Sequence, residues 1–192
     1  MLTLIAADIF GKTDALEKMA HQLPVESNVV DPYAGEKLSF ESEACAYQYF
    51  VKTVGMQNYL TQLQNTVDKS SRPIQLLGFS IGATACWKIA CSSEQKNIRR
   101  AICFYGSQIR HHLDLNPNVK TTAVLPKMEA SFDVEAMAAM LKQKEMLELV
   151  QTPYLHGFMN AQSDNFCAEA YAKYLHWLQK KLTADDPNTA LR

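Results

Sequence analysis

The chain has 192 residues, 47% of them hydrophobic and 20% charged, a composition that is typical of a globular protein and excludes a disordered or fibrous one. Nineteen Lys and Arg residues against twenty Asp and Glu residues give a formal charge of -1, so we expect no nucleic-acid partner. No apolar run approaches the roughly 18 residues of a membrane helix, and the segment Met1 to Ala7 lacks the basic leader of a signal peptide. We therefore expect a cytoplasmic protein with no membrane partner.

Short strand-like runs alternate with amphipathic helical segments, which is typical of a mostly parallel sheet with helices on both faces. The N-terminal part predicts, in order, a strand over 2–7, a helix over 14–23, a strand over 27–31, helices over 41–54 and 56–69, and a strand over 74–79. The C-terminal part predicts a helix over 81–91, strands over 100–105 and 121–125, a helix over 133–144, a strand over 147–152 and a helix over 166–182. The segment 106–120 shows no clear helical stripe. We predict one α/β domain over residues 1–182, followed by a polar tail over 183–192.

The chain has five cysteines, an odd number, and no pair of them has Cys-x-x-Cys spacing. This pattern argues against a disulfide framework and against a zinc ribbon. We interpret the five as small, reduced core residues, with one redox-reactive thiol as the alternative. They are Cys45, Cys86, Cys91, Cys103 and Cys167.

The strongest motif is G-x-S-x-G, which reads Gly78-Phe79-Ser80-Ile81-Gly82 and lies where a predicted strand turns directly into a helix. Such a turn holds the serine in a strained conformation above the edge of a sheet, and small neighbours are needed because the strand and helix pass close by. Ser80 is therefore the candidate nucleophile. The alternative is a tight strand-to-helix turn that contains a buried serine.

A serine of ordinary pKa needs a base within hydrogen-bond reach and an acidic group that orients the base. In this type of fold the acid precedes the histidine along the chain, and His156 follows the last predicted strand. The acid is expected in the loop after the strand 121–125. We favour Glu129 there, because Asp133 stands directly before a helical stripe and is explained as a helix cap.

The remaining histidines fit a catalytic role less well. His21 and His176 lie on predicted helices, and His111 and His112 lie in the unassigned segment. Together with Asp114, the adjacent pair forms only a weak candidate for a metal site, because adjacent histidines rarely point at one ion. We therefore expect no metal.

The oxyanion of an acyl-transfer reaction needs two backbone N–H donors. One is expected from Ile81, at the positive end of its helix, and the other from the loop Asp8-Ile9-Phe10-Gly11. The neighbouring Gly11-Lys12-Thr13 suggests the end of a phosphate-binding loop as an alternative. That motif requires glycine at position 6, where this chain has Ala6.

Four motifs in this order resemble the dienelactone hydrolase family of α/β-hydrolases, over nearly the whole chain. They are the loop Asp8 to Gly11, the serine motif Gly78 to Gly82, the strand end Phe104-Tyr105-Gly106 and the histidine loop His156 to Asn160. The resemblance implies a trimmed α/β-hydrolase sheet without the N-terminal hairpin of the family. It also places Glu129 where the family has its catalytic Asp, and it makes the N–H of Ile9 the second oxyanion donor.

The chain departs from the family in its nucleophile and in the groups expected around its pocket. The founding dienelactone hydrolases use cysteine where this chain has Ser80, and they have Glu where it has Asp8. They also hold the substrate carboxylate with arginines, one of them just beyond the histidine loop's Phe, where this chain has Met159-Asn160. Candidate pocket residues are Asp8, Phe10, Tyr105 and Arg110, although a solvated surface charge is the alternative for Arg110.

We therefore predict a serine hydrolase that cleaves a small ester or lactone through an acyl-enzyme and needs no metal or organic cofactor. The rival hypothesis is a non-catalytic binding or scaffold protein that retains the α/β-hydrolase fold. The sequence leaves the natural substrate and the oligomeric state open.

Overall fold

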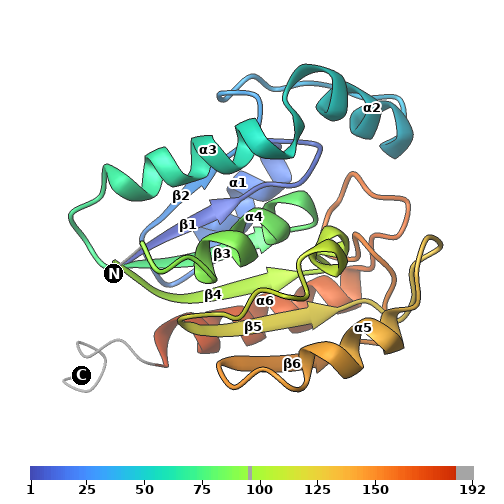
Figure 1. The fold of residues 1–192 in the computed structure, drawn as a ribbon. Coiled ribbons are helices and arrows are strands. Elements are labelled where there is room, and N and C mark those ends of the chain that lie inside the picture. Colours follow the sequence, from blue (N-terminus) through green and yellow to red (C-terminus); the bar gives the residue numbers. More distant parts are fainter. Residues whose placement is uncertain (95–96, 185–192) are drawn as a thin grey trace.

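A computed structural model describes residues 1–94 and 97–184 and contains a parallel sheet of six strands in the order β2-β1-β3-β4-β5-β6 (Figure 1). The strands are β1 (Leu2–Ala6), β2 (Ser27–Val30), β3 (Ile74–Phe79), β4 (Ile98–Phe104), β5 (Lys120–Leu125) and β6 (Leu147–Gln151). The helices are α1 (Asp14–Gln22), α2 (Glu43–Thr53), α3 (Gly55–Asp68), α4 (Ile81–Ala90), α5 (Val134–Leu141) and α6 (Ala168–Thr183), with a short 3-10 helix η1 (Ser107–His111). The predicted α/β fold, with its parallel sheet, is thereby confirmed.

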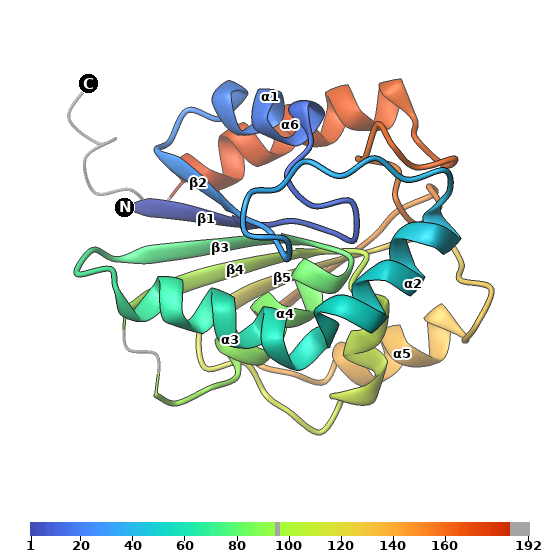
Figure 2. The ribbon, with the colours of Figure 1, turned by 90° about the horizontal axis from the view of Figure 1, so that it is seen from above.

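Helices cover both faces of the sheet, with α1 and α6 on one face and α2, α3, α4 and α5 on the other (Figure 2). Successive residues of the central strands point into opposite layers of core. In β1, Leu4 packs on the α3–α4 side and Ile5 on the α1–α6 side, and in β3 Leu76 and Leu77 divide in the same way. All four are fully buried, and each contributes roughly 1.5–3 kcal/mol of hydrophobic stabilisation, which explains the unbroken apolar runs of these strands.

The predicted elements recur in the predicted order, and the differences lie mainly at their ends. The cap of α1 is Thr13, whose hydroxyl accepts a hydrogen bond from the Leu16 N–H at 3.1 Å. The segment without a helical stripe contains η1, which is too short to show a period. The predicted tail from residue 185 onward lies outside the described residues, and Thr183 still belongs to α6.

The cysteine prediction is correct in part. Cys86 and Cys103 are buried free thiols, and burial raises the pKa of both. Cys45 is exposed on α2, so its interpretation as a core residue was wrong. The buried residues of α2 are Ala46 and Phe50, so Cys45 lies outside the face of the helix that packs against the core.

The strand order places the functional loops together. The chain runs from β1 outward to β2 and then returns to β3 on the other side of β1. Loops that leave neighbouring strands at such a reversal diverge and open a crevice at the carboxyl ends of the strands. The loops after β1 and β3 flank this point. No helix in the described part of the chain combines the length and the apolar composition needed to cross a membrane.

Candidate active site

Ser80 occupies the turn between β3 and α4 in a left-handed conformation, with φ 52° and ψ -113°. A non-glycine residue in such a conformation costs on the order of 1–3 kcal/mol, which the surrounding structure must offset. The two motif glycines permit the turn. A Cβ on Gly78 would lie 2.5 Å from the Gly82 carbonyl oxygen, and a Cβ on Gly82 would lie 2.2 Å from the Ala6 carbonyl oxygen. Any side chain at either position would therefore push α4 away from the sheet.

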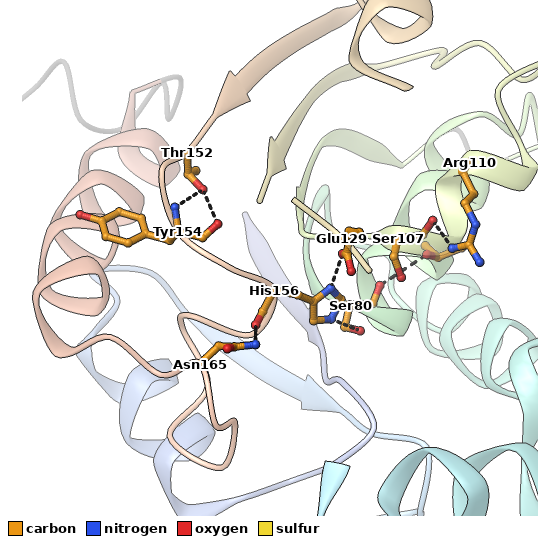
Figure 3. Close-up of polar contacts among 9 residues, drawn as sticks. Ser80, Ser107, Arg110, Glu129, Thr152, Tyr154, His156 and Asn165 are labelled. Atoms are coloured by element: carbon orange, nitrogen blue, oxygen red, sulfur yellow. Dashed lines mark hydrogen bonds and ion pairs between the residues drawn. The ribbon is translucent and has the colours of Figure 1, made fainter. Parts of the chain in front are cut away.

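Three sequence-predicted residues meet in one hydrogen-bonded chain (Figure 3). The distance from Ser80 Oγ to His156 Nε2 is 2.9 Å, and the distance from His156 Nδ1 to Glu129 Oε1 is 2.6 Å. The His156 side chain is 26% exposed and that of Glu129 is 13% exposed. The imidazole is thus close enough to take a proton from the serine, and the carboxylate is placed to fix its orientation.

The loop after β6 fixes the position of His156. Gly157 adopts φ 84°, and a Cβ there would lie 2.3 Å from Ser163 Oγ, so the turn requires glycine. Asn165 donates its side-chain amide to the His156 carbonyl at 2.9 Å (Figure 3). The ring of Tyr105 lies 4.9 Å from the imidazole between centroids. Backbone and ring contacts therefore limit the rotation of the histidine.

The two candidate acids have different surroundings. Asp133 is the N-cap of α5, and its carboxylate accepts hydrogen bonds from the N–H groups of Glu135 and Ala136 at 2.9 and 3.1 Å. Glu129 forms a bridge with Phe132 in the preceding loop and directs its side chain at His156. Geometry brings Glu129, and not Asp133, to the histidine.

The candidate oxyanion donors lie at the reversal point of the sheet. Ile81 is the first residue of α4, where a backbone N–H has no partner within its helix. Ile9 lies in a turn closed by a hydrogen bond from the Gly11 N–H to the Asp8 carbonyl, and its own N–H meets no acceptor among residues 1–94 and 97–184. Tyr33 holds this turn by donating its hydroxyl to the Ile9 carbonyl at 2.6 Å. Neither N–H is used by its own helix or turn, and Ile9 also lines the inner cavity beside Ser80.

Asp8 is the buried acidic neighbour of the serine. Burial raises its pKa to about 6, although hydrogen bonds from the Phe10 N–H and from the Asn160 side chain lower it. Nearby, the hydroxyl of Tyr105 is buried, and although the Met159 N–H approaches its oxygen, its own O–H donates to no acceptor among the described residues. A buried donor of this kind needs an explanation, and a bound oxygen atom would supply its partner.

Two cavities adjoin His156, and the inner one also adjoins Ser80. The inner one, of about 40 Å³, has room for only a few water molecules, and Asp8, Phe10 and Tyr105 contribute to its wall. The outer one, of about 410 Å³, includes Met128 and Leu155 in its wall and opens beside His156. Three of the four predicted pocket residues therefore line the inner cavity.

Arg110 is placed differently. Its guanidinium donates to the Ser107 carbonyl at 2.8 Å (Figure 3). It also lies over the ring of Phe132, 4.9 Å from the centroid. It lines neither cavity. Within the described residues, no group of three or more His, Cys, Asp or Glu side chains is arranged to hold a metal ion, the weak candidate around His111 and His112 included.

The sequence reasoning did not find Glu43, Ser163 and Asn165, which also line these cavities. Glu43 lies at the start of α2, a helix predicted only as a covering element. No local pattern distinguishes such a residue, because its place over the site results from the packing of α2 onto loops that are distant in sequence.

Comparisons with known proteins agree with the motifs. A sequence profile described as the dienelactone hydrolase family matches residues 3–183. YczH of Bacillus subtilis (strain 168), described as an uncharacterized protein, is 32% identical over 181 residues, which are 91% of this chain and 88% of that protein.

Among solved structures, a candidate dienelactone hydrolase from Klebsiella pneumoniae subsp. pneumoniae MGH 78578 superposes with a TM-score of 0.75 at 16% identity, over 96% of this chain and 87% of that one. Est1E from Butyrivibrio proteoclasticus superposes with a TM-score of 0.63 at 13% identity, over 95% of this chain and 87% of that one. These likenesses concern the fold, whereas the profile match extends to the sequence itself. The chain belongs to the dienelactone hydrolase family.

Proposed function

We propose that the protein is a serine hydrolase that cleaves small esters or lactones through an acyl-enzyme. Family membership indicates a hydrolase, and one observation carries the finer assignment. This observation is the hydrogen-bonded chain from Ser80 through His156 to Glu129, which starts on a strained turn at the carboxyl end of β3. The alternative of a non-catalytic scaffold would need none of these three side chains in contact.

In the proposed mechanism, Ser80 Oγ attacks the carbonyl carbon of the substrate while His156 Nε2 takes the hydroxyl proton. The N–H groups of Ile9 and Ile81 stabilise the oxyanion that forms. Collapse of this intermediate breaks the bond to the leaving alcohol, which receives the proton from His156. A water molecule then releases the acid by the same steps, and Glu129 stabilises the imidazolium in both halves.

The charges around the cavities favour a substrate without a carboxylate. No Lys or Arg of the described residues lines either of the two cavities beside His156, whereas the acidic residues Asp8, Glu43 and Glu129 contribute to their walls. A carboxylate entering this space loses hydration without a bidentate partner, at a cost of roughly several kcal/mol. We expect kcat/KM for a neutral lactone to exceed that for dienelactone of similar ring size. A clear preference for the charged lactone would contradict this expectation.

The decisive experiment treats the protein with a fluorophosphonate and locates the adduct by mass spectrometry, because an activated serine reacts far faster than an ordinary one. We expect the adduct on Ser80. Ser80→Ala should keep the fold and reduce turnover of p-nitrophenyl acetate by several orders of magnitude, because such residues act as a unit. Near-native turnover by this variant would exclude Ser80 as the nucleophile.

A further inference from the structure

Glu43 has an unusual environment for a charged side chain on a covering helix. It lies in the first turn of α2, after the N-cap Ser42, and is half buried. Its carboxylate forms no ion pair and no hydrogen bond with any other described residue. An acidic residue in a first turn does stabilise the helix dipole, but that role does not require burial against another loop.

The carboxylate of Glu43 faces the reacting groups. It contributes to the walls of both the inner and the outer cavity. Its Oε1 atom lies 3.6 Å from the position that a Cβ on Gly157 would occupy, next to His156. Its negative charge also helps to raise the pKa of Asp8 and of Tyr105, although burial is the larger cause in both cases.

Apolar groups share the outer cavity with this charge. Met128 follows β5 and is 56% exposed, and Leu155 follows β6 and is 41% exposed. Contact with a ligand would remove their apolar surface from water and so stabilise the complex. Because His156 must give its proton to the leaving oxygen, the alcohol of an ester lies on the His156 side, where this cavity opens.

Resting on the proposed function, we propose that Glu43 is a specificity-determining residue that selects esters whose alcohol carries a positive charge among apolar groups. A quaternary amino alcohol has this chemistry, since methyl groups surround its charge. The methyl groups would pack on Met128 and Leu155, and the charge would be attracted by Glu43. Glu129 also lines this cavity but is hydrogen-bonded to His156, whereas the Glu43 carboxylate has no partner among the described residues.

The test compares two acetate esters of nearly the same shape, acetylcholine and its uncharged analogue 3,3-dimethylbutyl acetate. The measured quantity is the ratio of their kcat/KM values at low ionic strength, divided by the ratio of their alkaline hydrolysis rates. This division removes the difference in leaving-group reactivity. The ratio is independent of the fraction of folded enzyme, so a loss of α2 stability in a variant does not affect it.

We expect the wild-type ratio to favour the cationic ester about fivefold, because a partly exposed charge pair contributes about as much as a surface ion pair. Glu43→Gln should bring the ratio near one, and added salt should do the same in the wild type. Glu41→Gln is the matched control, since it removes an equal charge from an exposed residue that lines neither cavity, and it should keep the wild-type ratio.

A wild-type ratio near one would overturn the specificity proposal, as would a preference that survives Glu43→Gln. Failure to hydrolyse either ester, while p-nitrophenyl acetate is cleaved in a manner that depends on Ser80, would also overturn it and leave the proposed function standing. Cleavage of p-nitrophenyl acetate that does not depend on Ser80 would overturn both.

Discussion

The burial of Asp8 makes a quantitative prediction about stability. Its pKa rises from 3.8 to about 6 on folding, mainly because burial removes water from the carboxylate. The native state therefore holds a proton that the unfolded state has released between roughly pH 4 and pH 6, and stability falls as pH rises through this range. This rise in the pKa lowers the free energy of unfolding of the wild-type protein at pH 8 by ~3 kcal/mol relative to its value at a pH below 4.

Asp8→Asn should remove this pH dependence. Asn can still accept the hydrogen bond from the Phe10 N–H, but its amide would face the Asn160 amide, whose oxygen already accepts from the Gln162 N–H. The variant therefore loses about one hydrogen bond, a cost of roughly 1 kcal/mol that is the same at every pH. The change in the free energy of unfolding between two pH values therefore reports only the effect of the Asp8 charge. From pH 4.5 to pH 8, we expect the free energy of unfolding of the variant to rise by about 2 kcal/mol relative to that of the wild type.

The assay is urea unfolding of both proteins at both pH values, evaluated with equal m-values. Titrating groups that do not interact with Asp8 cancel in the double difference, and the charges of His156 and Glu43, which do interact with it, are part of the measured effect. If the two proteins differed in free energy of unfolding by the same amount at pH 4.5 and at pH 8, the reasoning would be refuted. It would mean that Asp8 stays solvated, or that its hydrogen bonds fully offset its burial.

Two further predictions concern the candidate acids and the serine turn. Glu129→Gln should lower kcat on p-nitrophenyl acetate by orders of magnitude, while Asp133→Asn should be nearly silent because Asn caps helices about as well as Asp; the reverse ranking would exchange their roles. Gly82→Ala should destabilise the protein by about 3 kcal/mol or more in thermal or urea unfolding, because the new methyl group would meet a backbone oxygen at 2.2 Å. An unchanged unfolding midpoint would show that α4 can move.

The parts of the fold that follow from sequence are those decided by local chemistry. The run Ile74 to Phe79 is apolar except for Gln75 because both sides of β3 are buried, and the two glycines around Ser80 indicate that the backbones approach closely there. The resemblance of Gly11-Lys12-Thr13 to a phosphate-binding loop has an explanation that only the structure gives. Gly11 adopts φ 71° against the ring of Tyr33, and Thr13 caps α1. A sequence motif does not reveal such a tertiary neighbour.

The orientation of long side chains could not be predicted in the same way. Arg110 was a candidate for the pocket because it follows β4 at the correct edge of the sheet. Its guanidinium instead lies on Phe132, a residue 22 positions later in the chain. Glu43 is the opposite case, since nothing in its own segment directs it to the site.

The strand order also bears on how the protein would lose activity on heating. Ser80 follows the central strand β3, whereas His156 follows β6, an edge strand whose residues are partly exposed. Native proteins open first where few contacts hold the backbone, and edge strands are such places. Detachment of β6 would separate the histidine from the serine while the core around β1 and β3 remained closed. Hydrolysis should then decline at temperatures where hydrogen exchange still finds the amides of β3 protected and those of β6 already exchanging.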